Sequence, residues 1–591
     1  MGSKIVEGEV RPQEGSPISI AIAPIEQIIA QRFDHPLVTV DETVERFARF
    51  AREDNWHSLG QKFANQIMTR TCDAVGRQNA ALRGSNAAEY LSTIICALTN
   101  EILAQSNRYG SARWLWYLRR LPHHIFQGEL SSTWGYDASL TEALSFCSKA
   151  QEESLSTDRF AFRVHKSDFH HCIRFVAATK ALSHLHSQYR KAGKGGVLNF
   201  SEVMPFCENT PEVQSCIELY DDRADTAGGI ELAGLGLSNI TNATDALTPS
   251  TPHFRSDIFL FRLCEGVWMP SYGPDGKGGF CRSAVFMRHA LQSMPVDGIL
   301  GPYEQSSFAL PYLQQISPLL LLLNLFLTLS VEFPWALNAA LQCGYFVVSE
   351  SNFAQAFDRH APTVIEYFSR SAPDVNWSRS YRQWHDDVAK IEPVLWPLRS
   401  GGVVRRGGGA IMIDLTAASR SLLQGLQIDR SAAGLANTRA ATFELSIQKM
   451  IDTTPWKPPS PLANLRGLTL RRNRISLTDL DAIGSSDNVL LLVSCKSVIH
   501  DPEYDKGTYR VVRNLQSTVD EAVISWAKII SILRAEPSGD NYDFRQFKLI
   551  LGVVCVPFVV YSSSNATLAF ISGTLRASCS ATELRQWLTS S

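Results

Sequence analysis

The chain has 591 residues, 45% of them hydrophobic, with 56 basic and 58 acidic side chains. This length exceeds what one hydrophobic core usually supports, so we expect roughly two to four domains. The near balance of charge excludes a protein that coats polyanions in general, because such binding needs an excess of Lys and Arg to neutralise phosphates. A local basic groove is still compatible with this composition.

Cysteine spacing and hydropathy indicate the compartment. The 12 cysteines lie singly, without a CxxC pair, which fits neither a zinc ribbon nor a disulfide framework. The N-terminus lacks the apolar stretch of a signal peptide. The most apolar run, residues 318–331, is shorter than the ~20 residues that span a bilayer, so we expect a buried core helix there. The sequence thus predicts a soluble, cytoplasmic protein without a membrane partner.

Helical periodicity dominates the first part of the chain. Residues 1–20 are polar and contain Pro and Gly, a composition typical of disorder. Apolar residues three and four apart predict packed helices over much of 21–250, which we expect to form a mainly helical domain. Residues 251–400 mix a strand-like run with long apolar helices and predict a helix-rich central domain. Clustered glycines then predict a linker with a strand and helix connection over 401–437.

The final block, 438–591, has the clearest pattern. A helix over ATFELSIQKMID precedes two strand-like pieces, GLTLRRNRIS and SLTDLDAIG, and a GSSDN turn leads into the apolar strand NVLLLVSCKSV. A long amphipathic helix and a second apolar strand, FKLILGVVCVPFVVY, follow. Strands separated by a long helix predict a partly parallel sheet in an α/β sandwich. The expected fold class is α+β and multidomain, with a mostly helical N-terminal and central region before a C-terminal α/β domain.

Two pairs of polar side chains lie beside the expected hairpin. Strand periodicity predicts that Asp479 and Asp481 share one face of their strand, and that Ser494 and Lys496 share one face of the next. Magnesium prefers oxygen ligands and is commonly held by one or two carboxylates, water and a substrate phosphate. A lysine beside it can stabilise charge on the reacting phosphoryl group or position the attacking water. The pattern therefore predicts a site for metal-dependent chemistry on a phosphodiester.

In this order of elements, the runs DLDAIG, which starts at Asp479, and VSCK, which ends at Lys496, resemble the PD-(D/E)XK nuclease superfamily. The resemblance covers about the last quarter of the chain and implies a restriction-endonuclease-like fold. It implies that Asp481 is the metal-binding aspartate of the first half-motif and Lys496 the lysine of the second. Ser494 stands where the second half-motif has Asp or Glu.

The resemblance also implies roles for three further residues. The backbone carbonyl of Cys495 lies where the family often gives the metal another oxygen. Glu444, on the preceding helix, matches an acidic residue that many members bring from their first core helix. Gln516, on the helix after the motif, matches a polar residue that some members use to orient phosphate or water.

Ser494 is the departure from the family pattern. A neutral hydroxyl contributes much less to Mg²⁺ binding than a carboxylate, so the metal would be held by Asp481 with help from Glu444 or Asp479. Weak activity, single-metal activity and no activity are all compatible with this substitution.

Arginines flank the expected site in sequence. They could contact a nucleic-acid backbone, or simply solvate a turn and a helix end. These residues are Arg471, Arg472, Arg474, Arg510 and Arg513.

The sequence therefore predicts a nuclease that hydrolyses nucleic acid, DNA in preference to RNA, with Mg²⁺ or Mn²⁺. Microbial defence or DNA processing would suit such a modular enzyme, and the helical region would recognise a protein partner or activator. One alternative is a catalytically degenerate nuclease fold that binds nucleic acid or a partner without cutting. A second alternative is a structural interaction protein whose C-terminal sheet does not bind nucleic acid.

Overall fold

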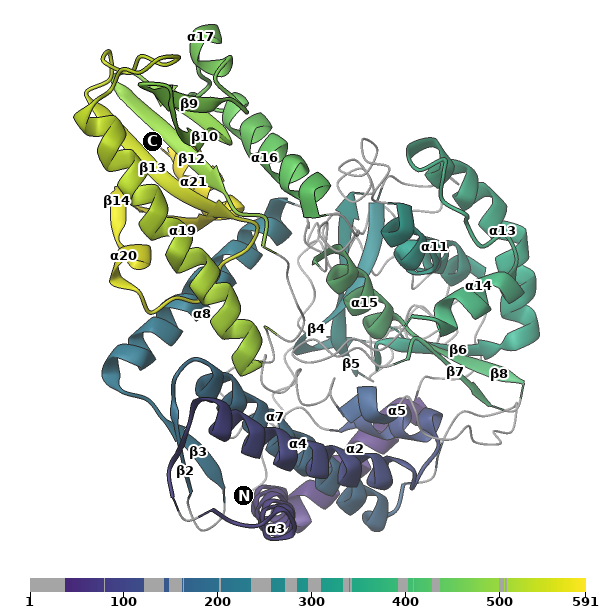
Figure 1. Cartoon of the computed structure of the whole chain (residues 1–591). Helices are drawn as coiled ribbons and strands as arrows, with labels where there is room; N and C mark the ends of the chain where they lie inside the picture. The colour runs from purple at the N-terminus through teal and green to yellow at the C-terminus, as the bar shows by residue number, and fades with distance from the viewer. Residues whose placement is uncertain are drawn as a thin grey trace. The chain divides into compact units, whose positions relative to one another are not determined.

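The chain forms two compact units in a computed structural model (Figure 1). One unit comprises Met1–Ile67, Thr99–Ala181 and Leu235–Gln427, and the other comprises Met68–Leu98, Leu182–Gly234 and Ile428–Ser591. The structure describes residues 38–78, 80–121, 143–147, 162, 164–200, 204–234, 257–270, 284–295, 310–332, 340, 343–391, 402–407, 409–427, 436–498, 504 and 507–590. The N-terminal segment 1–20, for which we predicted disorder, lies outside these residues.

The first unit combines helices with two antiparallel sheets. Its helices are α2 (Val38–Glu53), α5 (Ser111–Arg120), α11 (Leu310–Glu332), α13 (Glu350–Ser371), α14 (Tyr381–Ala389) and α15 (Leu415–Gln427). Its strands are β4 (Asp257–Pro270), β5 (Ala284–Pro295), β6 (Tyr345–Ser349), β7 (Val404–Gly407) and β8 (Ala410–Asp414). Strands β4 and β5 pair as an antiparallel ribbon, and the other three form an antiparallel sheet in the order β6-β8-β7.

Helix α11 is the centre of this unit's core. Its apolar run includes Leu320, Leu322 and Phe326, which have no exposed surface and pack with residues of α13, α14 and α15. Burying a leucine fully stabilises a fold by about 1.5–3 kcal/mol, so a helix that is apolar all round is stable only inside a core. The predicted helix over 318–331 is confirmed, and its described side chains, at 318–326 and 329, are buried. No helix in the described part of the chain is long and apolar enough to cross a membrane.

Three helices have residues in both units: α3 (Trp56–Val75), α4 (Gly84–Ser106) and α7 (Lys166–Gly193). The second unit adds α8 (Pro211–Gly234), α16 (Ala436–Asp452), α17 (Ser460–Ala463), α19 (Tyr509–Ala535), α20 (Asn565–Leu568) and α21 (Ala581–Ser590). Its strands in the first half of the chain are β1 (Leu82–Arg83), β2 (Val197–Phe200) and β3 (Pro205–Glu208). Those in the second half are β9 (Thr469–Arg472), β10 (Ile475–Asp479), β11 (Ala482–Ser486), β12 (Val489–Cys495), β13 (Leu549–Val556), β14 (Phe570–Ser572), β15 (Leu575–Arg576) and β16 (Ser578–Ser580).

A four-stranded mixed sheet with the order β11-β12-β13-β16 organises the second unit. Strands β11 and β12 form an antiparallel hairpin, while β12 pairs with β13, and β13 with β16, in parallel. The predicted hairpin and partly parallel sheet are therefore confirmed. So is the predicted α+β class, since helices dominate the first half and mixed sheets occur toward the C-terminus.

The sheet is covered on both faces, which explains its continuous apolar strands (Figure 1). Leu490 and Leu492 pack in one core with α19, whereas Leu491 and Val493 pack in a second core with α16 and α21. The α19 side is tight at Gly552 of β13, where an added Cβ would lie 2.1 Å from Cγ1 of Ile530.

Helix α8 belongs to the core on the α19 side of the sheet, although it precedes the sheet by more than two hundred residues. Its Tyr220 packs beside Tyr561, with ring centroids 6.1 Å apart. Its Arg223 contacts both carboxylate oxygens of Glu583 on α21, at 2.7 and 2.9 Å. The sheet is therefore assembled with helices from distant parts of the chain.

Candidate active site

Asp481 lies at a corner between two sheets. We expected Asp479 and Asp481 on one face of a single strand, but β10 ends at Asp479 and β11 begins at Ala482. The cause is Leu480, which is fully buried and continues the β9–β10 ladder, because its N–H donates to the carbonyl of Leu468 at 3.1 Å. The two aspartates therefore lie at a corner between two strands and not within one strand, and the Asp481 carboxylate contacts the end of β12.

The Asp481 carboxylate is fixed at the end of β12. Its Oδ2 accepts the backbone N–H of Cys495 at 2.7 Å, and the Ser494 hydroxyl also hydrogen-bonds to it. Burial raises the pKa of Asp481, and the Cys495 N–H, the Lys496 charge and the Ser494 hydroxyl offset only part of this rise. The carboxylate is thus held in a partly desolvated position that favours an additional cation.

Lys496 follows β12 directly, and the sheet fixes its backbone. Its N–H donates to the carbonyl of Cys555 at 2.8 Å, which extends the parallel β12–β13 ladder by one residue. Strand alternation places Ser494 on the same face of the sheet as Leu490 and Leu492, which is the face that α19 covers. The positive charge of Lys496 lowers the pKa of both Asp481 and Glu444, so its ammonium lies in the field of both carboxylates.

Glu444 comes to this site from α16. Burial raises its pKa, the negative charges of Asp481 and Asp479 raise it further, and Lys496 opposes them. Asp481, Asp479 and Lys496 therefore all lie within electrostatic range of Glu444. The helix on one face of the sheet and the hairpin at its edge meet at this point.

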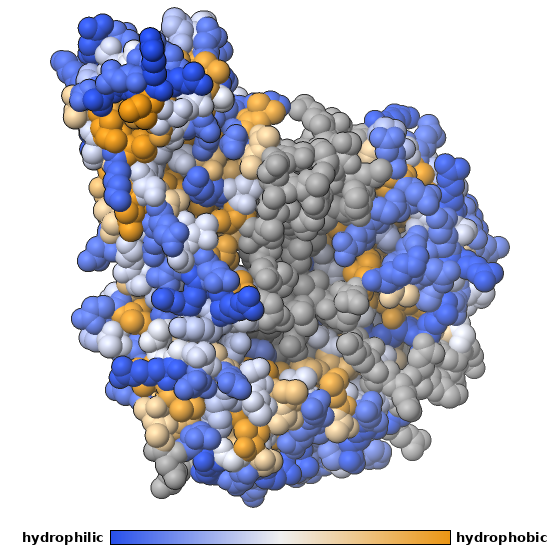
Figure 2. Space-filling view, viewed as in Figure 1, coloured by the Kyte–Doolittle hydropathy of each residue, from blue (hydrophilic) through white to orange (hydrophobic). Residues whose placement is uncertain are grey.

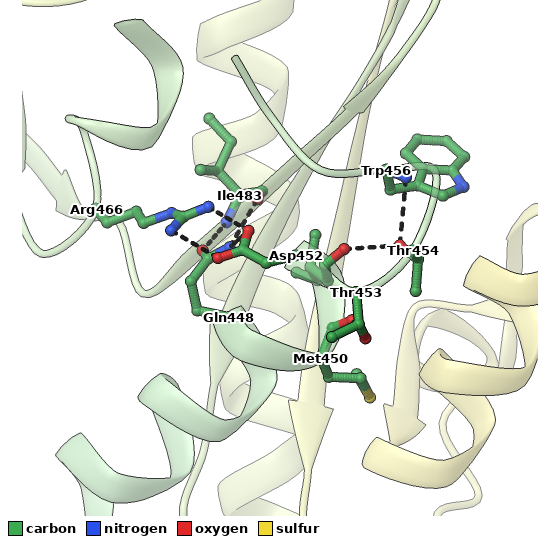
Figure 3. Close-up of polar contacts among 9 residues, drawn as sticks. Gln448, Met450, Asp452, Thr453, Thr454, Trp456, Arg466 and Ile483 are labelled. Atoms are coloured by element: carbon green, nitrogen blue, oxygen red, sulfur yellow. Dashed lines mark hydrogen bonds and ion pairs between the residues drawn. The ribbon is translucent and has the colours of Figure 1, made fainter. Parts of the chain in front are cut away.

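Sequence reasoning missed Gln448, which fixes α16 against the hairpin (Figure 3). Its Oε1 accepts the N–H of Ile483 at 2.9 Å, and its Nε2 donates to the carbonyl of Ile483 at 3.3 Å and to Asp452 at 3.2 Å. Arg466 holds Asp452 in turn through two contacts of 2.6 and 3.0 Å. Gln448 lies one helical turn after Glu444, so the same side of α16 carries both residues.

The remaining predicted site residues have other contacts. Asp479 is exposed, and its carboxylate accepts the Thr469 hydroxyl. Gln516 is buried on α19, on the other side of the sheet from α16, and its amide donates to Ser563 at 3.0 Å. Cys495 points its thiol into the core beneath α16, where burial raises the thiol's pKa, so only its backbone carbonyl remains as a candidate ligand.

The predicted arginines lie at two different ends of the sheet. Arg472 pairs with Glu536 at 2.6 Å, and the Arg474 N–H donates to Asp540 at 2.7 Å, so the β9–β10 turn lies beyond the C-terminal end of α19. Arg510 and Arg513 lie in the first turns of α19, which follows the end of β12. Since α19 connects the end of β12 to the start of β13, only these two arginines share the Lys496 end of the sheet.

The corner brings the carboxylates of Asp481 and Glu444 within electrostatic range of each other. Among the residues that the structure describes, no group of three or more His, Cys, Asp or Glu is arranged to hold a metal ion. The pKa values of Asp481 and Glu444 are both raised, although the charge of Lys496 acts to lower them. Mg²⁺ commonly uses one or two carboxylates together with water and a substrate phosphate.

Comparisons with protein-family models, curated proteins and solved structures find no significant match to this chain. The family resemblance thus rests on motif spacing and on the order of elements.

Proposed function

We propose that the C-terminal α/β domain is PD-(D/E)XK-like and hydrolyses phosphodiester bonds of nucleic acid with Mg²⁺ or Mn²⁺. The observation that carries this proposal is the electrostatic interaction of Glu444 with Asp481 and Lys496 where the β11–β12 hairpin joins a parallel strand pair. DNA is the proposed substrate in preference to RNA. The protein would act in the cytoplasm, in microbial defence or DNA processing, with the helical region recognising a partner or activator.

Each residue has a distinct role in this mechanism. Asp481 and Glu444 would hold the cation, which supplies Lewis acidity at the phosphoryl group when bound. Lys496 would position the attacking water and stabilise the negative charge that develops on the phosphoryl oxygens. Ser494 would orient the Asp481 carboxylate through its hydroxyl. Arg510 and Arg513 would contact neighbouring phosphates at the start of α19.

The test is cleavage of single- and double-stranded DNA and RNA with Mg²⁺, Mn²⁺ or EDTA. Asp481→Ala and Lys496→Ala are each expected to lower the cleavage rate by about 100-fold or more. Lys548→Ala is the matched control, because Lys548 is exposed and its N–H pairs with Asn488 at the opposite end of β12. Cleavage that survives both site substitutions would refute the assignment.

A second candidate function is binding without cleavage. Ser494 favours it, because this position lacks the carboxylate that would strengthen metal binding. In that case the protein binds nucleic acid in EDTA, cleaves none in any metal, and loses affinity when Arg510 and Arg513 are replaced by Gln.

A further inference from the structure

A cavity of about 270 Å³ opens between α8, the β14–β15 hairpin and α21. Its lining combines the planar groups of Phe570, Arg576 and Trp587 with polar groups that include Asp222 and Gln586. Small-molecule sites typically pair apolar and aromatic walls with a few polar groups that orient the ligand. The chemistry of the lining therefore indicates a planar ligand with hydrogen-bonding edges.

The charges in the wall are not equally available to a ligand. Arg223 is satisfied internally, because it contacts Glu583 through two hydrogen bonds and donates to the Ser578 carbonyl at 3.1 Å. Arg576 donates Nη1 to the Leu568 carbonyl at 2.5 Å, and the structure gives its other nitrogens no hydrogen bond among the described residues. Burial lowers the pKa of Arg576, and the neighbouring charge of Arg223 adds to this effect. Arg576 is therefore the cation in the cavity that an anionic group would stabilise.

The Arg576 guanidinium lies over the Phe570 ring, and this stacked pair forms the Phe570–Arg576 platform. The Arg576 guanidinium carbon lies 3.9 Å from the centroid of the Phe570 ring, and Phe570 is 58% exposed. The guanidinium thus covers one face of the ring, and the ring keeps exposed surface on which a second planar group can stack. Nucleobases stack on aromatic rings and on guanidinium planes, and each stacked base contributes enough that alanine substitution lowers affinity several-fold.

The cavity lies near the candidate active site along the sheet. Cys579, in the cavity wall, is in register with Cys555, which is in register with Cys495. Two strand spacings are about 10 Å, so the wall lies about that far from the backbone N–H that holds Asp481. A single strand of a few nucleotides spans such a distance.

We propose that this cavity binds a nucleotide, with its base on the Phe570–Arg576 platform and its phosphate accepting hydrogen bonds from Arg576. Asp222 and Gln586 would then read the edge of the base. The nucleotide would belong to the strand held at Asp481 and Lys496, and this part alone rests on the proposed nuclease function.

The experiment measures fluorescence anisotropy of a labelled, short single-stranded DNA with the full chain in EDTA, where metal-dependent cleavage cannot occur. Phe570→Ala and Arg576→Gln are each expected to weaken binding about fivefold or more. Leu549→Ala and Arg545→Gln are matched controls with exposed side chains at the start of β13 and just before it, and they should bind like the native chain. Deoxyadenosine monophosphate should compete with the oligonucleotide, whereas deoxyribose 5-phosphate should not.

The outcomes separate this inference from the proposed function. Equal binding by the native chain and both cavity variants overturns the nucleotide site, even if the protein cleaves DNA. Failure of the native chain to bind either the oligonucleotide or the mononucleotide overturns it as well. Mononucleotide binding that both variants lose supports the cavity even if no condition yields cleavage, in which case only the proposed nuclease activity fails.

Discussion

The side-chain amide of Gln448 completes the free edge of the central sheet by pairing with both the N–H and the carbonyl of Ile483. Strand β11 is one of the two edge strands, so without Gln448 these two backbone groups of the buried Ile483 would lack a partner. The same contact fixes the position of α16 and therefore of Glu444, one turn earlier.

Replacing Gln448 with Ala should lower the free energy of unfolding by about 1–3 kcal/mol, because two buried backbone groups lose their hydrogen bonds. Urea denaturation of the variant checks this value. Lys449→Ala changes the exposed neighbour on α16 and should leave stability within about 0.5 kcal/mol of native. A Gln448→Ala chain as stable as the Lys449→Ala chain would show that the contact is dispensable.

Ser494→Asp would place a carboxylate where the PD-(D/E)XK pattern has one. Ser494 is buried beside Asp481, so a second carboxylate there should raise the Mg²⁺ affinity and the cleavage rate. In EDTA the same variant should lose roughly 1–3 kcal/mol of stability, since two carboxylates repel in a partly desolvated corner. Thermal unfolding with and without Mg²⁺ measures both effects. Ser494→Asn is the control, because it adds similar volume without charge and should gain nothing from the metal.

A methyl group at Gly552 should disrupt the packing of α19 on β13. The added Cβ would overlap Cγ1 and Cδ1 of Ile530, and overpacking of this kind typically costs about 1–3 kcal/mol. Ile530→Val in the same chain should recover part of the loss. Gly60→Ala is a control, because its Cβ would meet Ile173 at an ordinary 3.7 Å. Chemical denaturation of the four chains gives the comparison.

The Arg223–Glu583 pair should make stability depend on pH. Burial acts to raise the pKa of Glu583, but the hydrogen bonds and charge of Arg223 and the Ser580 N–H outweigh it and hold the pKa below its usual value. A lowered carboxyl pKa contributes stability that is fully present above the unfolded-state pKa of about 4.3 and is lost as pH falls through the folded-state pKa.

Glu583→Gln should therefore cost about 1–3 kcal/mol at pH 7 and progressively less below about pH 4. Urea denaturation of the native and variant chains across this pH range measures the difference. A constant difference at every pH would show that charge plays no part in the contact.

The sequence was sufficient for the elements of the C-terminal sheet but not for their assembly. The continuous apolar run before Lys496 is typical of a buried strand, and apolar residues three and four apart along α19 are typical of a helix. Strand β12, its hairpin and the helix were therefore predictable. The corner at Leu480 was not, because it depends on pairing with Leu468 and has no turn residue to mark it. Gln448 could have been found as a polar residue beside Ile447 on the buried side of α16.

Contacts between segments far apart in the sequence could not be predicted from local sequence patterns either. The pairing of Arg223 with Glu583 joins residues 360 apart, and the sequence around either residue gives no sign of its partner. The electrostatic grouping of Glu444 with Asp481 came from the family resemblance, since periodicity places them on different elements.

The origin of the second unit in three separate stretches affects how the protein can be made. Tyr220 of α8 emerges from a ribosome about 340 residues before Tyr561, its partner in the core. At bacterial-scale synthesis rates of ~5–20 residues per second, this interval is on the order of tens of seconds. During that time the apolar side of α8 has no sheet to cover it. Nascent chains that stop before β13 should therefore be targets for chaperones and proteases, however well their earlier helices have formed.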